Sequence, residues 1–198
     1  MQSHGGWTSK TVARRAFDSA RAAVSPPPVG GTNCCQLACA TTFIPVNPDH
    51  YLLTPLGRVW TPERNTVAWE QAYVQLTSAL TGAPRILYLV CGLQGAGKSS
   101  WIKVSMPRLA PCVFFDAALP RAVHRLPVIT IARSAGTQAR CVWIDTPLEI
   151  ALKRNAERRD DERVPESSIR SVAAQFEAPS VSEGFIEVIR VEGAEEFR

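Results

Sequence analysis

Hydrophobic positions change their spacing near Pro84, and this change divides the chain into two parts. Between Trp69 and Leu80, apolar residues recur every three or four positions, which is the period of an amphipathic helix. Thr61 and Pro62 begin this segment, and Pro is favoured at the first helical position because its missing N–H would have no partner there. We therefore predict a structural helix that begins at Pro62 and ends near Gly82.

After Pro84, short and nearly continuous apolar runs alternate with helical patterns. This alternation is typical of a parallel sheet whose strands are buried on both faces and joined by crossover helices. The sequence therefore predicts an α/β three-layer sandwich with a mostly parallel sheet. The predicted strands are Arg85 to Cys91, Cys112 to Phe115, Arg140 to Ile144 and Ile186 to Val191.

The first part of the chain has no sustained periodicity. Residues 1–45 are rich in Ser, Ala, Gly and Arg and include three consecutive prolines, so we predict a mobile, poorly ordered arm with a short helix from Thr11 to Ala23. A transit peptide is the alternative, which Asp18 disfavours. From Tyr51 to Trp60, broken apolar runs suggest an extended segment or hairpin. The expected division is an arm over 1–50 and one nucleotide-binding domain over 51–198.

Composition excludes several classes of protein. With 45% hydrophobic and 20% charged residues and no apolar stretch near the roughly 18 residues of a membrane helix, the chain is expected to be soluble and cytoplasmic, with no membrane association. The net charge of +4 is mild and spread along the chain, whereas nucleic-acid-binding proteins display a denser basic stripe.

Six cysteines fall into two groups. Cys91, Cys112 and Cys141 lie inside predicted strands and are expected to be reduced core thiols. The cluster at positions 34, 35 and 39 has cysteines at close spacing, but it lacks a C-x-x-C pair and a suitably spaced His, so a metal site there is the weaker interpretation.

One segment carries a complete phosphate-binding motif. Gly92 to Ser99 match G-x-x-x-x-G-K-[ST] between a predicted strand and a helical pattern, which is the context that a P-loop requires. Its backbone N–H groups surround phosphate oxygens, Lys98 reaches the β and γ phosphates, and Ser99 is suited to bind Mg²⁺. We therefore predict ATP with Mg²⁺ on a P-loop NTPase fold. The expected nucleotide-binding residues are Gly92, Gln94, Gly95, Ala96, Gly97, Lys98, Ser99 and Ser100.

A P-loop also requires an acidic residue at the end of a neighbouring strand, where it orients the water shell of the metal ion. Asp116 and Asp145 both occupy such positions. Asp145 precedes Thr146 and Glu149 in a pattern typical of a helix-capping box, which already accounts for it. We therefore favour Asp116 as the metal-associated and catalytic carboxylate, with Asp145 as the alternative.

The helix expected from Thr146 continues into a charged segment that contains Asn155, Arg158, Arg159 and Arg163. The plainest interpretation is a solvated turn. In phosphate-transferring enzymes, however, arginines of a mobile lid balance the charge of the phosphoryl group during transfer. A lid is therefore the second interpretation. A further helix is predicted after Pro165.

Several of these segments resemble one group of enzymes. Beyond the P-loop they are Asn155 with Arg158, Val164-Pro165, Gln175 to Pro179, and Glu183 to Phe185. In this order and spacing they resemble the kinase domain of polynucleotide 5′-hydroxyl kinases and the wider group of small P-loop kinases and ATP-binding proteins. The similarity spans Arg85 to Val191, a little over half of the chain.

The resemblance implies transfer of the γ-phosphate of ATP to a hydroxyl with the help of Mg²⁺. It implies lid arginines, carried first by Arg158 and then by Arg159 and Arg163. It also implies that Asn155 and its helix help to frame the nucleotide.

The chain departs from these kinases on the acceptor side. They carry an Asp that accepts the proton of the attacking hydroxyl, in a segment between the P-loop helix and the next acidic strand. Here only Pro107 to Pro111 stand in that place, and Ala117, Ala118 and Leu119 follow Asp116 where the kinases carry polar residues. The acceptor-binding part of the site is therefore reduced in this chain or different from that of these kinases.

Two functions follow from these observations. The first is a small kinase in which Lys98, Asp116 and Arg158 are catalytic and Asp116 is both metal-shell ligand and general base. Its acceptor would be a nucleic-acid end or a small hydroxyl-bearing metabolite. The second is an ATPase or nucleotide-dependent switch that signals to a partner through the N-terminal arm. A purely non-catalytic interaction protein fits poorly with Lys98, Ser99 and Asp116 together, and the sequence leaves the oligomeric state open.

Overall fold

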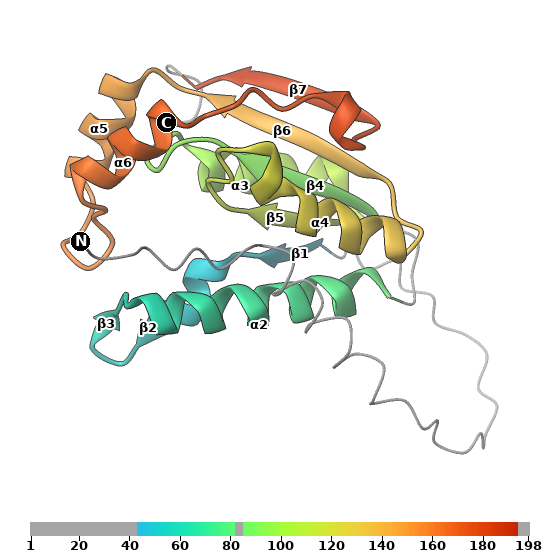
Figure 1. Ribbon diagram of the computed structural model, residues 1–198, viewed down its shortest axis with the longest axis horizontal. Helices are drawn as coiled ribbons and strands as arrows, with labels where there is room; N and C mark the ends of the chain where they lie inside the picture. Colours follow the sequence, from blue (N-terminus) through green and yellow to red (C-terminus); the bar gives the residue numbers. More distant parts are fainter. Residues whose placement is uncertain (1–42, 82–84, 194–198) are drawn as a thin grey trace, which may run out of the picture.

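Five parallel strands form the centre of the computed structural model, which describes residues 43–81 and 85–193 (Figure 1). Their order across the sheet is β1, β5, β4, β6, β7. The strands are β1 (Phe43–Val46), β4 (Ile86–Cys91), β5 (Cys112–Asp116), β6 (Ala139–Asp145) and β7 (Glu187–Glu192). All four neighbouring pairs are parallel, which confirms the predicted α/β sandwich with a P-loop NTPase fold.

Strand β1 lies in a region that the sequence analysis assigned to the N-terminal arm. That boundary is wrong, because Phe43–Val46 pairs in parallel with residues 112–115 of β5 and forms the edge of the sheet. The strand is only four residues long and contains Pro45, which an edge strand tolerates because one side needs no ladder hydrogen bonds. Its shortness and its proline concealed it in the sequence. The expected helix from Thr11 to Ala23 lies outside the described residues, as does the cysteine cluster at positions 34, 35 and 39.

Helices cover both faces of the sheet. They are α2 (Pro62–Leu80), α3 (Lys98–Leu109), α4 (Ala122–Ser134), α5 (Leu148–Ala156) and α6 (Glu166–Ala174). Two short 3-10 helices, η1 (Pro48–Leu52) and η2 (Val181–Glu183), and a hairpin of β2 (Leu53–Thr54) with β3 (Gly57–Arg58) complete the described elements. The predicted start of α2 is confirmed, since the Thr61 side chain accepts a hydrogen bond from the Arg64 N–H. No helix among the described residues is long and apolar enough to cross a membrane.

Alternate residues of the central strands β4, β5 and β6 face two separate cores. Leu87 and Leu89 of β4 pack in a core with α2 and α4, whereas Tyr88 and Val90 pack with residues of α3, α5 and α6. This two-sided burial explains the continuous apolar runs in the sequence. Cys91, Cys112 and Cys141 are buried free thiols, as predicted.

A buried arginine fastens the segment that follows β5. Arg125 of α4 is fully buried, and its guanidinium donates to the carbonyl oxygens of Leu119 and Glu177 at 3.0 and 3.1 Å. Two further bonds of 2.7 and 2.8 Å join it to the carboxylate of Glu183. The Glu177 carboxylate accepts from the Ala122 N–H at the start of α4. These bonds fix the path of the chain directly after Asp116.

Replacing Glu183 by Gln tests this clamp. Glu183→Gln leaves the Arg125 charge buried without a counter-charge, and the expected loss in free energy of unfolding is about 3 kcal/mol, measured by urea denaturation. Glu166→Gln is the control, because the Glu166–Arg170 pair lies on the surface and its loss should leave the unfolding midpoint nearly unchanged. Equal effects of the two substitutions would contradict the proposed role of Glu183.

Candidate functional site

The loop between β4 and α3 has a backbone that only glycine accommodates at two positions. Gly92 and Gly95 have φ values of 144° and 83°. A Cβ atom at Gly92 would lie 2.5 Å from the Ile144 carbonyl oxygen, and one at Gly95 would lie 2.2 Å from the Ala151 carbonyl oxygen. Both contacts are far inside van der Waals distance. The glycines of the motif are therefore required by close packing of the loop against β6 and α5.

The start of α3 faces this loop without a side-chain cap. Gly97 is the N-cap residue with a φ of 102°, and no side chain accepts hydrogen bonds from the first turn of the helix. Lys98, Ser99 and Ser100 form that first turn. Uncapped N–H groups and the positive end of the helix dipole favour an anion at this place.

Two side chains hold the carbonyl oxygen of Ala96. The Thr146 hydroxyl donates to it at 2.9 Å and the Arg154 guanidinium at 3.2 Å. The C=O and N–H of a trans peptide unit point in opposite directions, so this anchoring turns the Gly97 N–H away from Thr146 and Arg154. Thr146 and Arg154 thus hold the loop on the side opposite the Gly97 N–H.

This arrangement corrects the predicted capping box. Thr146 does not cap the following helix, because α5 begins at Leu148 with Pro147 as its N-cap and no side-chain cap. The Thr146 hydroxyl bonds to the P-loop instead. Arg154, which lies near the end of α5, was missed by sequence reasoning.

Lys98 places a positive charge inside the loop. Its ammonium donates to the carbonyl oxygens of Gly92 and Leu93 at 3.2 and 2.9 Å. Burial lowers the pKa of Lys98, an effect that the neighbouring Asp116 opposes. The Oε1 atom of Gln94 in the same loop is buried without a hydrogen-bond partner. A loop that holds a buried cation fits the negative charge of a polyphosphate.

Ser99 and Asp116 meet at the mouth of the loop. The Ser99 hydroxyl donates to Asp116 Oδ2 at 2.9 Å, and Asn47 Nδ2 reaches the same oxygen at 3.4 Å. Asp116 is only 7% exposed. A hydroxyl beside a carboxylate is the kind of oxygen pair that Mg²⁺ takes from a protein when phosphates and water supply the remaining ligands. The described residues contain no cluster of three or more His, Cys, Asp or Glu that would suit a metal held by protein alone.

The alternative carboxylate, Asp145, is engaged elsewhere. Its Oδ2 accepts from Nε of Arg190 at 2.8 Å and pairs with a second nitrogen of the same guanidinium. Arg190 lies on β7, so this pair ties the ends of two neighbouring strands together. Asp145 is therefore placed to stabilise the sheet, whereas Asp116 faces Ser99.

The charged segment after α5 folds back on itself. The Asn155 side chain is buried and bonds to both the N–H and the carbonyl of Val164 at 3.0 and 2.7 Å. It thereby closes the turn over residues 156–164. The structure shows Asn155 in this clamp, and its predicted part in framing a nucleotide stays a prediction.

The three arginines of this turn differ in their surroundings. Arg159 is exposed and pairs with Asp161 and Glu162, and Arg163 pairs with Asp160. Arg158 is half-buried and lies close enough to Lys98 to influence its charge. Within the described part of the chain, Arg158 forms no ion pair with a carboxylate. Of the three, Arg158 is the one whose charge contributes to lowering the pKa of Lys98.

The end of β1 supplies two residues that the sequence analysis missed. Asn47 contacts Asp116, and the Asp49 carboxylate acts electrostatically on Lys98 while it pairs with Arg58 at 3.2 Å. The signal in the sequence is an apolar run that ends in Asn47-Pro48-Asp49, since Asn-Pro marks a turn after a strand. The same reasoning located Asp116.

Comparisons with known proteins agree with this fold. A family model described as an AAA domain matches residues 105–179. The match begins within α3, after the P-loop, so it is independent of the motif at Gly92 to Ser99. No curated protein sequence matches the chain. Motif, sheet topology and family match together show a P-loop nucleotide-binding domain.

Removing the Lys98 ammonium tests the site directly. Lys98→Ala should weaken ATP binding by at least about tenfold, because water cannot replace a desolvated cation at the β and γ phosphates. Isothermal titration calorimetry measures the change. Lys103→Ala is the matched control, since Lys103 lies on the same helix but is exposed. Unchanged affinity in Lys98→Ala would contradict nucleotide binding at this loop.

Proposed function

We propose that this protein is a small kinase that transfers the γ-phosphate of ATP to a hydroxyl group. The observation that carries the proposal is the contact of Ser99 with Asp116 at 2.9 Å, beside the Lys98 ammonium. A P-loop for polyphosphate, an oxygen pair for Mg²⁺ and a carboxylate at the mouth are the parts that phosphoryl transfer requires. The family match and the parallel sheet support the nucleotide-binding half of this proposal.

The proposed roles follow from position. Lys98 balances the negative charge of the β and γ phosphates, and the N–H groups at the start of α3 orient their oxygens. Arg158, which lies near Lys98, adds positive charge where the phosphoryl group moves. Ser99 and, through water, Asp116 would hold Mg²⁺, which would offset the negative charge of the phosphates.

The proposed groups account for each bond and proton that changes in the reaction. The acceptor oxygen forms a bond to the γ phosphorus while the bond from that phosphorus to the β–γ bridging oxygen breaks, and ADP leaves. The hydroxyl proton passes to the carboxylate of Asp116. Asp116 would therefore serve as metal-shell ligand and proton acceptor.

ATP hydrolysis or nucleotide-dependent switching is the second candidate. Only Ala110 and Pro111 separate α3 from β5, so no acceptor-binding segment follows the P-loop helix. If the chain lacks a bound acceptor altogether, water takes the phosphoryl group or ATP stays intact. Incubation with γ-labelled ATP and a pool of alcohols, nucleosides and oligonucleotides separates the two, because label on an acceptor supports a kinase and label in free phosphate alone opposes it.

Replacing each of the two strand-end carboxylates by Asn tests the role of Asp116. Asp116→Asn should reduce the rate of phosphate release or transfer by about 100-fold or more, because the amide cannot accept the proton. Asp145→Asn should keep the rate within about threefold, since Asp145 is bound to Arg190 and not to Ser99. Labelled ATP turnover at saturating substrate measures both. The assignment is wrong if the two variants lose activity equally.

A further inference from the structure

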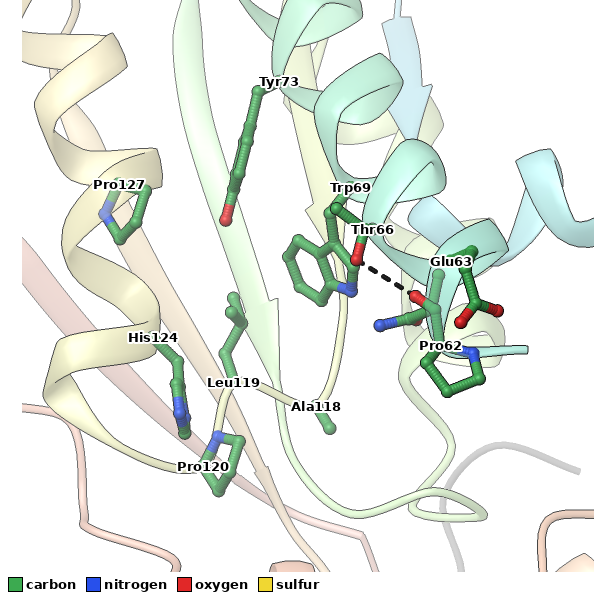
Figure 2. A pocket seen from close by; sticks show the side chains of 11 residues that line it. Pro62, Glu63, Thr66, Trp69, Tyr73, Ala118, Leu119, Pro120, His124 and Pro127 are labelled. Atoms are coloured by element: carbon green, nitrogen blue, oxygen red, sulfur yellow. Dashed lines mark hydrogen bonds between the residues drawn. The ribbon is translucent and has the colours of Figure 1, made fainter. Parts of the chain in front are cut away.

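A pocket of about 860 Å³ opens between α2 and α4. Figure 2 shows Trp69 and Tyr73 from α2 facing Pro127 and His124 from α4, with Leu119 and Ala118 at its base. Its size falls within the range of small-molecule sites, which is about 300 to 1,000 Å³. The pocket therefore has room for a compact organic molecule.

The pocket lies next to the proposed catalytic carboxylate. Ala118 of its wall follows Asp116 by two positions, and the Ala118 carbonyl accepts from the N–H of Gly92, the first residue of the P-loop, at 3.3 Å. The starts of α2 and α4 both line it, so it lies at the carboxyl end of the parallel strands. In α/β sheets, ligands bind at this end. A molecule in the pocket would thus share a wall with the site of phosphoryl transfer.

Aromatic rings form a rigid side of the pocket. Trp69 packs against Tyr73 and Phe115 with ring centroids 5.7 and 6.1 Å apart, and Tyr73 stacks on Phe115 at 6.2 Å. Phe115 is the residue before Asp116, so this aromatic group is anchored to the strand that carries the carboxylate. Flat aromatic faces of this kind favour a planar ring in the ligand.

The pocket wall carries little charge. None of the 11 lining residues in the described part of the chain is Lys or Arg, and Glu63 is the only acidic one. Three arginines adjoin lining residues in sequence, and all are engaged: Arg64 donates to the Val59 carbonyl, Arg121 pairs with Glu177 and Arg125 pairs with Glu183. Burial lowers the pKa of His124, helped by Arg121 and Arg125, so its imidazole is neutral at pH 7. A nucleic-acid strand would need cationic contacts for its phosphates, which this wall does not offer.

We propose that this pocket binds the phosphate acceptor, and that the acceptor is a small uncharged alcohol built on a planar or apolar ring. The proposal rests on the proposed kinase function and specifies its substrate. The acceptor side of the site is then supplied by α2, which precedes the P-loop in the chain, together with the loop after Asp116. This origin explains why no acceptor segment is found between α3 and β5.

Narrowing the pocket from the side of α2 tests the proposal. Thr66 lines the pocket and is exposed, so Thr66→Phe should fill its mouth without disturbing the core. With nucleosides and phenylethanol as acceptors and labelled ATP as donor, the KM for the acceptor should rise by about tenfold or more while ATP affinity stays unchanged. Val67→Phe, at the exposed neighbouring position, should behave like the unaltered protein. Ala118→Phe fills the pocket from its base and serves as a second variant.

The outcomes separate this proposal from the kinase proposal. If transfer occurs but Thr66→Phe and Ala118→Phe leave the acceptor KM unchanged, or if only a 5′-hydroxyl oligonucleotide is labelled, the pocket assignment is overturned and the kinase function stands. If no acceptor is labelled, the kinase function fails. Ligand-observed NMR with adenosine and phenylethanol then tests independently whether the pocket binds a small alcohol. The pocket assignment is supported if either compound binds the unaltered protein and neither Phe variant. It is overturned if neither compound binds at millimolar concentration.

Discussion

The parallel pairing of β4 with β5 is the constraint on which the site depends. In this register Val90 lies opposite Asp116, so the P-loop begins beside the strand end that carries the carboxylate. The pairing brings Ser99 within 2.9 Å of Asp116, although 17 residues separate them in the chain. Any slip of one residue would turn Asp116 to the other face of the sheet. Burial of both strands on two faces, and not the polar residues themselves, therefore sets the geometry of the site.

The residues most specific to the family resemblance have structural roles in this chain. Glu177 and Glu183 hold the buried Arg125, and Arg125 in turn holds the carbonyl of Leu119. Asn155 closes the turn that carries Arg158. None of these contacts touches the P-loop, yet each fixes a segment that lies next to it. A recurring sequence pattern can thus mark the supports of a site as well as its reactive groups.

Much of the fold followed from the sequence because its signals are local. Strands β4, β5 and β6 are mostly apolar runs, β7 keeps a shorter apolar pattern, and the P-loop is a complete motif with a strand before it and a helix after it. The edge strand β1 was not predictable in this way, since four residues with a proline carry little periodicity. Because β1 was not predicted, Asn47 and Asp49 just after its end were not recognised as site residues. Thr146 was misassigned for another reason: its hydroxyl bonds across 50 positions to Ala96, a contact that no local pattern encodes.

We propose that Ser99 and Asp116 hold Mg²⁺ on ATP bound at the P-loop. Calorimetric titration of ATP in the presence and absence of Mg²⁺ tests it most directly, with the Ser99→Ala protein measured alongside. We expect Mg²⁺ to strengthen ATP binding to the unaltered protein, and most of this gain to be lost in Ser99→Ala. ATP affinity that does not respond to Mg²⁺ in either protein would contradict it.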